Sequence, residues 1–82
     1  MNRILTPEVT DAITRVLKCG EVTHPGDEWK RVDAGVHFDH MLGHLEAATR
    51  GGVDEYSGEL HLAHAITRGI MALHHVLTGG RI

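Results

Sequence analysis

The sequence contains few of the residues that stabilise secreted, membrane-bound or base-stacking proteins. It has a single cysteine, Cys19, so it can form neither an internal disulfide nor a zinc site built from cysteines. It has one residue each of Phe, Trp and Tyr, too few for a surface that stacks successive bases. No apolar run approaches the roughly 20 residues that cross a bilayer, and residues 1–5 lack the pattern of a signal peptide. We therefore expect a cytoplasmic protein that makes no membrane contact.

Signatures of several enzyme classes are also absent. The chain has no GxSxG nucleophile motif, no phosphate-binding glycine loop and no HExxH metal motif. Cys19 has no evident base beside it in the sequence, so a cysteine nucleophile is not indicated.

The chain carries no excess of positive charge. Its formal net charge of −3 at pH 7 argues against a partner such as duplex nucleic acid, which is held by phosphate contacts. Eight histidines are the unusual feature of the composition, and protonation of all of them would reverse the sign of the net charge. Because imidazoles titrate near neutral pH, affinity for anions is expected to change sharply in that range.

Apolar residues at helical spacing predict an all-α fold with three helices in a single domain, residues 1–82. Thr6 and Pro7 are typical of a helix start, and Gly20 is expected to end this first helix. Residues 21–35 are expected to form a loop with one short helical turn around Trp29. The second helix is predicted at about 36–50. The third is predicted at about 59–78, capped by residue 57 or 58.

The two later helices are too apolar for a small isolated chain. The second has an apolar stripe, and the third is apolar over more than half of its circumference. A helix of that kind needs more than one neighbour, so we expect a helical bundle completed by homo-oligomerisation. The apolar residues are Phe38, Met41, Leu42, Leu45 and Ala48 in the second helix, and Leu62, Ala63, Ile66, Ile70, Leu73, Val76 and Leu77 in the third.

A narrow polar stripe on the third predicted helix consists of His61, His64, Arg68 and His75. The two histidines of HLAHA lie three residues apart, so their imidazoles share one face. They can bind one metal ion, or they can hold a phosphate oxygen together with Arg68. The alternative is that the stripe is the solvated side of an apolar helix.

The second predicted helix carries His37, His40 and His44 on one flank of its apolar stripe. Flanking side chains reach into the gap between packed helices, so His44 could face the third helix. The alternative is a histidine at the rim that donates to a backbone carbonyl, and this is favoured for His37 and His40.

The connector between these helices is acidic, with Asp54, Glu55 and Glu59. Carboxylates are the natural ligands of magnesium or manganese, which would in turn meet nucleotide phosphates. Acids in loops are usually only solvated. We consider Asp54 the best candidate of the three.

Trp29, Lys30 and Arg31 place one ring and two cations in a polar loop. A lone tryptophan there either pins the loop to the core or stacks on a flat ligand such as a base. Pinning is the favoured interpretation.

The order of these segments resembles a known family. Trp29 and basic residues are followed by HFDHMLGHLEAA, a glycine break, an acid with SG, and HLAHA. Over about residues 29–77 this is similar to the phage and bacterial dATP/dGTP diphosphohydrolase N-terminal domain family, an all-helical group distantly related to MazG-like nucleotide pyrophosphohydrolases. The resemblance implies removal of pyrophosphate from a purine deoxynucleoside triphosphate with a divalent cation. By position, the family's functional residues match Trp29, His44, Asp54, His61 and His64.

Three departures from the family pattern affect what the resemblance implies. Tyr56 stands where the family usually has a second acid, and Gly43 stands where it usually has arginine. MazG-like enzymes hold magnesium with carboxylates, whereas the matching stretches here are mostly histidine. Magnesium prefers oxygen ligands, so Mg²⁺ or Mn²⁺ is expected if Asp54 dominates, and Zn²⁺ or Ni²⁺ if the histidines dominate.

These observations lead to three hypotheses. The first is metal-dependent hydrolysis of a small-molecule nucleotide, with His44, Asp54, His61 and His64 as metal ligands. In this hypothesis Asp54 and His44 are catalytic, and a bound water attacks while Arg68 neutralises charge on the phosphate. The remaining ligand-binding candidates are Trp29, Lys30, Arg31 and His75. The second hypothesis is a phage-type protein that sequesters a nucleotide or a nucleotide-derived signal without cleaving it. The third is a structural or partner-binding helical module.

Overall fold

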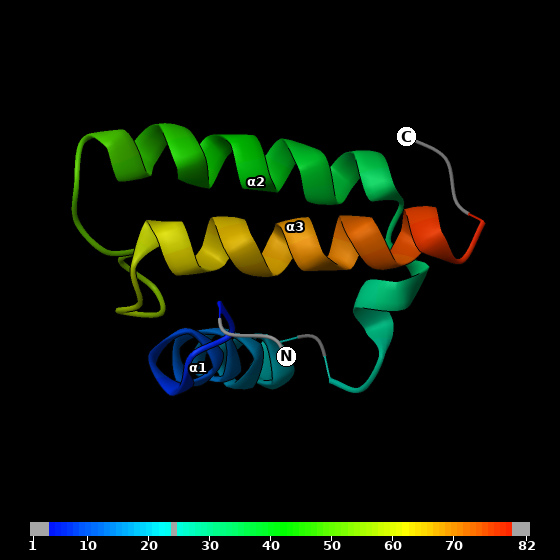
Figure 1. Ribbon diagram of the computed structural model, residues 1–82, viewed down its shortest axis with the longest axis horizontal. Helices are drawn as coiled ribbons and strands as arrows, with labels where there is room; N and C mark the ends of the chain where they lie inside the picture. The colour runs from blue at the N-terminus through cyan, green and yellow to red at the C-terminus, as the bar shows by residue number, and fades with distance from the viewer. Residues whose placement is uncertain (1–3, 24, 80–82) are drawn as a thin grey trace.

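Three α-helices and one turn of 3₁₀ helix make up the computed structural model, which describes residues 4–23 and 25–79. They are α1 (Pro7–Thr23), η1 (Glu28–Arg31), α2 (Ala34–Thr49) and α3 (His61–Leu77), shown in Figure 1. The described residues contain no strand, only an isolated bridge between Val53 and Leu60. The predicted all-α fold is confirmed, as is the short helical turn around Trp29.

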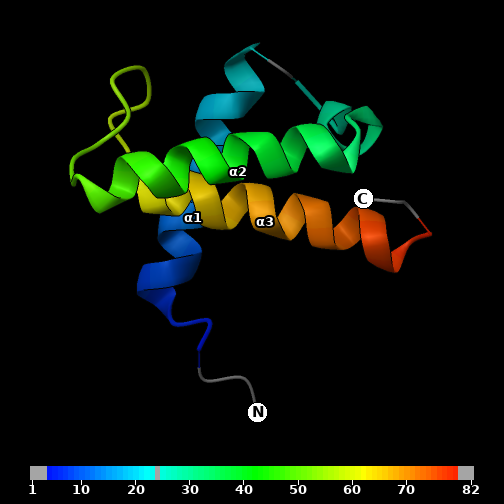
Figure 2. The same cartoon turned by 90° about the horizontal axis from the view of Figure 1, so that it is seen from above.

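The helices α2 and α3 lie side by side and antiparallel, and α1 crosses beneath α3 (Figure 1). Seen from above, α1 runs across the other two helices instead of along them (Figure 2). In the described chain α1 packs against α3 and not against α2. The chain between α2 and α3 reverses direction within eleven residues and returns beside the start of α3.

The first helix begins as predicted but is longer than predicted. The hydroxyl of Thr6 accepts a hydrogen bond from the backbone N–H of Val9 at 3.3 Å, and Pro7 occupies the first turn. The prediction that Gly20 ends the helix was wrong, because α1 continues to Thr23. Gly20 is not among the glycines with positive φ, so its backbone does not break the helix.

The starts of the other two helices also differ from prediction. The second helix starts at Ala34, because the Asp33 carboxylate accepts a hydrogen bond from the N–H of Gly35 at 3.0 Å and caps it there. The third starts at His61, with Leu60 as an N-cap that makes no side-chain hydrogen bond. Residues 57–60 belong to the loop that precedes α3, so the helix starts two residues later than predicted.

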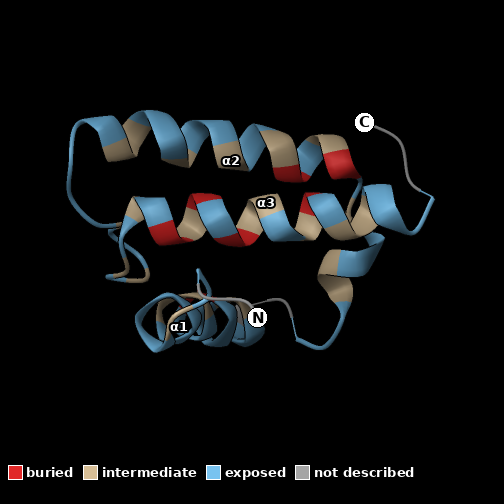
Figure 3. Ribbon diagram, viewed as in Figure 1, coloured by how far each residue is buried: buried red, intermediate tan, exposed pale blue. Residues whose placement is uncertain are grey.

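Small side chains fill the interface between the helices. The buried apolar residues are Val16, Ala34, Ala63, Ala65 and Ala72, four of which are alanines in α2 and α3. The small size of most of these side chains lets the helices pack closely. Figure 3 shows buried positions where α2 and α3 face each other and also on the side of α3 toward α1, while the outer surfaces are exposed.

The larger apolar side chains of α3 therefore lie outside this interface. In the single chain Leu62, Ile66, Ile70, Leu73, Val76 and Leu77 are all exposed, as are Leu42 and Leu45 of α2. The histidine-bearing side of α3 faces inward instead. An exposed apolar face is what an oligomer would cover, but homo-oligomerisation stays a prediction. Among the described residues, no helix is both long enough and apolar enough to cross a membrane.

Two helical glycines provide a matched test of this packing. A methyl group added at Gly43 meets no atom within 4 Å, whereas one added at Gly69 would lie 3.1 Å from the Met41 sulfur. We expect Gly43→Ala to raise the free energy of unfolding by about 0.5–1 kcal/mol, because alanine loses less backbone entropy in a helix. Gly69→Ala should raise the free energy of unfolding by less, because the Met41 side chain must move to make room for the methyl group. Urea unfolding of both variants measures this, and equal gains would show that the α2–α3 interface has room for a methyl group.

Candidate functional site

A groove of about 870 Å³ lies between α1, η1, α2, α3 and the loop before α3. One side is apolar and includes Val16 and Leu17 of α1 together with Val36 and Met71. Polar residues line the rest, among them Trp29, His37, His40, His44, Asp54, Ser57, His64, Thr67 and Arg68, together with the acids Glu21, Asp27 and Glu28 toward α1 and η1. The volume is in the range of small-molecule sites, which are commonly about 300–1,000 Å³.

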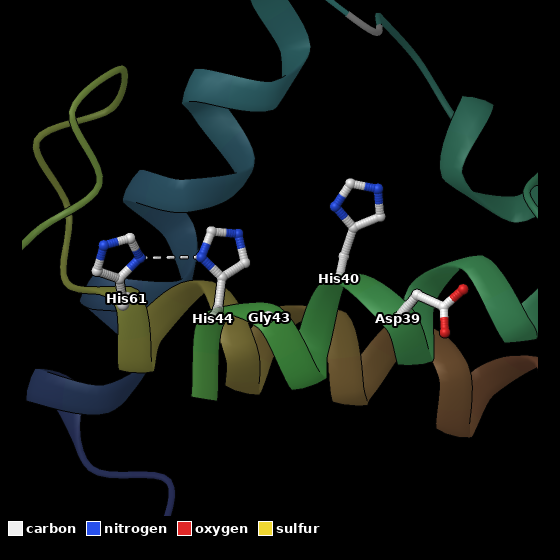
Figure 4. A pocket seen from close by; sticks show the side chains of 5 residues that line it. All are labelled: Asp39, His40, Gly43, His44 and His61. Carbon is white, nitrogen blue, oxygen red and sulfur yellow. Dashed lines mark hydrogen bonds between the residues drawn. The ribbon is translucent and has the colours of Figure 1, made fainter. Parts of the chain in front are cut away.

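Three potential metal ligands converge where α2, the loop and α3 meet. His44, Asp54 and His61 each offer one ligand atom, and these atoms lie within 4.8 Å of one another. The Nδ1 atoms of His44 and His61 are 3.0 Å apart and share a hydrogen bond, drawn as a dashed line in Figure 4. His61 is not among the residues that line the groove, but it lines a smaller pocket of about 370 Å³ beside His40 and His44, which line both pockets. The described residues therefore include a cluster that could hold a metal ion.

The carboxylate of Asp54 is fixed by the backbone of its own loop. Its Oδ1 accepts hydrogen bonds from the N–H groups of Tyr56 at 2.9 Å and Ser57 at 3.0 Å. Partial burial by itself would raise the pKa of this carboxyl. The two N–H groups, together with the nearby imidazoles of His64 and His44, nevertheless hold the pKa below its ordinary value. Asp54 is therefore ionised at neutral pH and oriented before any ligand arrives.

His64 lies beside the cluster, with its ring stacked on that of His44 at a centroid distance of 4.6 Å. Its Nε2 is 2.6 Å from the hydroxyl of Ser57, which itself accepts a hydrogen bond from the N–H of Glu59 at 3.1 Å. The hydroxyl proton of Ser57 is thus free to be donated to His64. Burial is the main reason that the pKa values of His44 and His64 are lowered. Both rings are expected to be neutral at pH 7, with lone pairs available as acceptors.

A second group of polar side chains lies farther along α2 and α3. His37 has no exposed surface, and its Nε2 lies 2.9 Å from the backbone oxygen of Trp29. Its Nδ1 lies 3.0 Å from Nη1 of Arg68. The expectation that His37 sits at the rim was wrong, although it does donate to a backbone carbonyl. The sequence did not reveal this position, because a helical wheel counts histidine as polar and the partners of His37 are distant in the sequence.

Trp29 pins η1 against the end of α3. Its ring makes edge contacts with His37, His74 and His75, at centroid distances of 6.5, 5.1 and 6.5 Å. The Nε2 of His75 also lies 3.4 Å from the Trp29 backbone oxygen. These contacts agree with the pinning interpretation, and Trp29 also lines the groove.

The site residues predicted from the sequence thus divide into the metal-ligand cluster, the lining of the groove and positions outside the groove. His44, Asp54 and His61 come together, and His64 stacks against them through His44. Arg68 and Trp29 line the same groove. Lys30, Arg31 and His75 are not among its lining residues, and Lys30 pairs with Asp27 at 3.4 Å. Ser57, which the sequence suggested only as a helix cap, instead contacts His64.

The buried histidines predict a stability that depends on pH. Burial lowers the pKa of His37 below the 6.5 of an unfolded histidine, so at lower pH the unfolded chain binds a proton that the folded chain does not. The pKa values of His40, His44 and His64 are lowered as well. We therefore expect the free energy of unfolding to fall as pH decreases below about 6.5. Urea unfolding between pH 7.5 and 5 measures this, and His37→Asn should make the dependence shallower. A flat profile would contradict the prediction.

Comparison with known proteins agrees with the resemblance found in the sequence. A family model described as "dATP/dGTP diphosphohydrolase, N-terminal" matches residues 1–82, and so also covers the first helix. No curated protein and no solved structure matches the chain. The match over the whole chain shows that this protein belongs to the dATP/dGTP diphosphohydrolase N-terminal domain family.

Proposed function

We propose that this domain binds a purine deoxynucleoside triphosphate in the groove and hydrolyses it, with a divalent metal, to the monophosphate and pyrophosphate. The family supports a nucleotide hydrolase context. The observation that carries the proposal is the convergence of His44, Asp54 and His61 beside a groove that also contains Arg68. A metal-ligand cluster and a cationic side chain on one groove are an arrangement suited to a phosphate ester.

The donor set fits a divalent transition metal better than magnesium. Two imidazole nitrogens and one carboxylate oxygen are ligands typical of Mn²⁺, Fe²⁺, Co²⁺, Ni²⁺ or Zn²⁺. Magnesium keeps several waters and is usually bound through carboxylates and phosphates. The 3.0 Å between the two Nδ1 atoms is short enough for both to contact one ion at the usual distance of about 2.0–2.1 Å. His44, Asp54 and His61 would therefore hold the ion.

The remaining residues can bind and orient the substrate. An ion held by the cluster would polarise a phosphoryl oxygen and lower the pKa of a bound water. Asp54 and His44 remain the residues to which we assign a catalytic role. Arg68 lies one helical turn beyond His64 on the same face of α3, so its guanidinium can neutralise charge on neighbouring phosphate oxygens. The apolar side of the groove can exclude water from the nucleoside.

Loss of any cluster residue should abolish both metal binding and turnover. We expect Asp54→Asn, His44→Gln and His61→Gln each to reduce pyrophosphate release from dATP or dGTP by more than about 100-fold, because a ligand is lost. The assay is run with Mn²⁺, and EDTA should stop the reaction in the wild type. Metal content is measured in parallel by elemental analysis of the purified protein.

Two variants serve as controls for this experiment. Glu55→Gln removes the exposed acid next to Asp54, and His74→Gln removes a histidine outside the groove lining. Both should keep the wild-type metal content and rate. Wild-type protein that releases no pyrophosphate from any triphosphate, with any of these metals, would refute hydrolysis.

Binding without cleavage is the second candidate function, because the cluster contains only one carboxylate. The side chain of Tyr56, at the position where the family usually has an acid, is almost fully exposed. A site of neutral imidazoles and one cation can hold a phosphate without generating a metal-bound nucleophile. In this case calorimetry would show saturable nucleotide binding that survives EDTA, and chromatography would recover the ligand unchanged.

A further inference from the structure

His37 is the largest side chain in the described structure with less than 2 % of its surface exposed. It lies between the backbone carbonyl of Trp29 and the guanidinium of Arg68, and it is not part of the metal-ligand cluster. A buried imidazole costs free energy unless its polar atoms are hydrogen-bonded. Both ring nitrogens are bonded here, at 2.9 and 3.0 Å.

The two partners of His37 determine its protonation state. The Trp29 carbonyl can only accept a hydrogen bond, so Nε2 must carry a proton. The Arg68 guanidinium can only donate, so Nδ1 must present a lone pair. Both contacts therefore require the same neutral tautomer, with the proton on Nε2. An imidazolium would face Arg68 with a second positive charge.

Arg68 has no carboxylate partner among the described side chains. The ion pairs there are Arg15 with Glu59, Lys30 with Asp27, and Arg50 with Glu46. Arg68 is half-buried and lines the groove, and burial lowers its pKa. Burial is the main reason that the pKa values of the groove histidines His40 and His64 are lowered, and the positive charge of Arg68 adds to this effect. A guanidinium has five N–H donors, and the contact with His37 is made by Nη1 alone.

The chemistry of this contact differs from that of an ordinary ion pair. A carboxylate would orient Arg68, but it would also neutralise the charge that attracts an anion. A neutral imidazole can orient the guanidinium through one hydrogen bond and leave its charge uncompensated. The cost of ordering the long side chain is then met on folding, before a ligand arrives.

We propose that His37 is a positioning residue that holds the Arg68 guanidinium in place to bind the polyphosphate of the substrate. The inference rests on the proposed nucleotide-binding function and names the part of the groove that receives the phosphates. It assigns the metal cluster and Arg68 to separate contacts on one ligand. His37 itself touches no substrate.

Two substitutions at His37 each retain one of its hydrogen bonds. In His37→Asn the amide oxygen lies as many bonds from Cα as Nδ1 does, so it can still accept from Arg68. In His37→Gln the amide nitrogen lies as many bonds from Cα as Nε2 does, so it can still donate to Trp29. Both remove a buried ring, so urea unfolding should show that both are folded and destabilised. Arg68→Gln measures the contribution of the guanidinium itself.

The probe is inorganic tripolyphosphate in EDTA, so that the metal cluster plays no part, and calorimetry gives its Kd. We expect His37→Asn to bind within about 2-fold of the wild type and His37→Gln to bind roughly 2- to 10-fold more weakly, the usual cost of immobilising a free side chain. Arg68→Gln should weaken binding at least as much. Equal affinities for the two His37 variants would overturn the proposal, as would tripolyphosphate binding that Arg68→Gln leaves unchanged.

The tautomer of His37 tests the geometry of its two hydrogen bonds directly, because both of them require the proton on Nε2. We expect ¹⁵N-edited NMR spectra of the imidazoles to show His37 with its proton on Nε2 at pH 7. Addition of tripolyphosphate should leave that tautomer in place. A proton on Nδ1 would refute the contact with Arg68. None of these measurements involves turnover. They therefore test the role of His37 even if the protein does not hydrolyse nucleotides.

Discussion

The close approach of α2 and α3 is the constraint on which the site depends. Small buried residues such as Ala34, Ala65 and Ala72, together with Gly69 beside Met41, let the two helices pack closely. The interface is consequently narrow, and polar side chains reach across it from both sides. His44 meets His61 and His64 at one end of the helix pair, and His37 meets Arg68 toward the other. Larger residues in the interface would separate these pairs, because each is joined by contacts of about 3 Å or by ring stacking.

The loop before α3 supplies the anionic part of the site. The N–H of Asp54 donates to the oxygen of Glu59 at 2.8 Å, and the N–H of Gly58 donates to the oxygen of Asp54 at 2.8 Å. These backbone bonds turn the chain back on itself, with Gly58 at a φ of 73°. The side chain of Asp54 then accepts two further N–H groups. A single ionised carboxylate is therefore fixed in direction beside the imidazoles of His44 and His61, a donor set that would favour borderline metals over magnesium.

The sequence predicted the helices well, because their apolar residues recur at helical spacing over several turns. It placed two of the helix starts incorrectly, because each depends on a contact that periodicity does not contain: the Asp33 cap at α2 and the bridge of Leu60 to Val53 before α3. The shared face of His61 and His64 followed from their spacing. Their different environments did not, because the contact of His64 with Ser57 depends on how the loop folds back. The burial of His37 depends on its partners, Trp29 and Arg68, which are 8 and 31 residues away.

The same packing explains why the apolar residues of α3 lie on the outside. An interface of alanines has no room for Leu62, Ile66 or Leu73, so helix periodicity places them on the opposite face. The polar side of α3, which would be solvated in an ordinary amphipathic helix, lines the groove instead. A mostly neutral set of histidines can occupy that interior position only because each buried ring nitrogen has a partner, and no described buried side-chain nitrogen or oxygen lacks one. The histidines thus line a polar interior without adding fixed charge, and Arg68 is the cationic side chain that a phosphate ligand would meet in the groove.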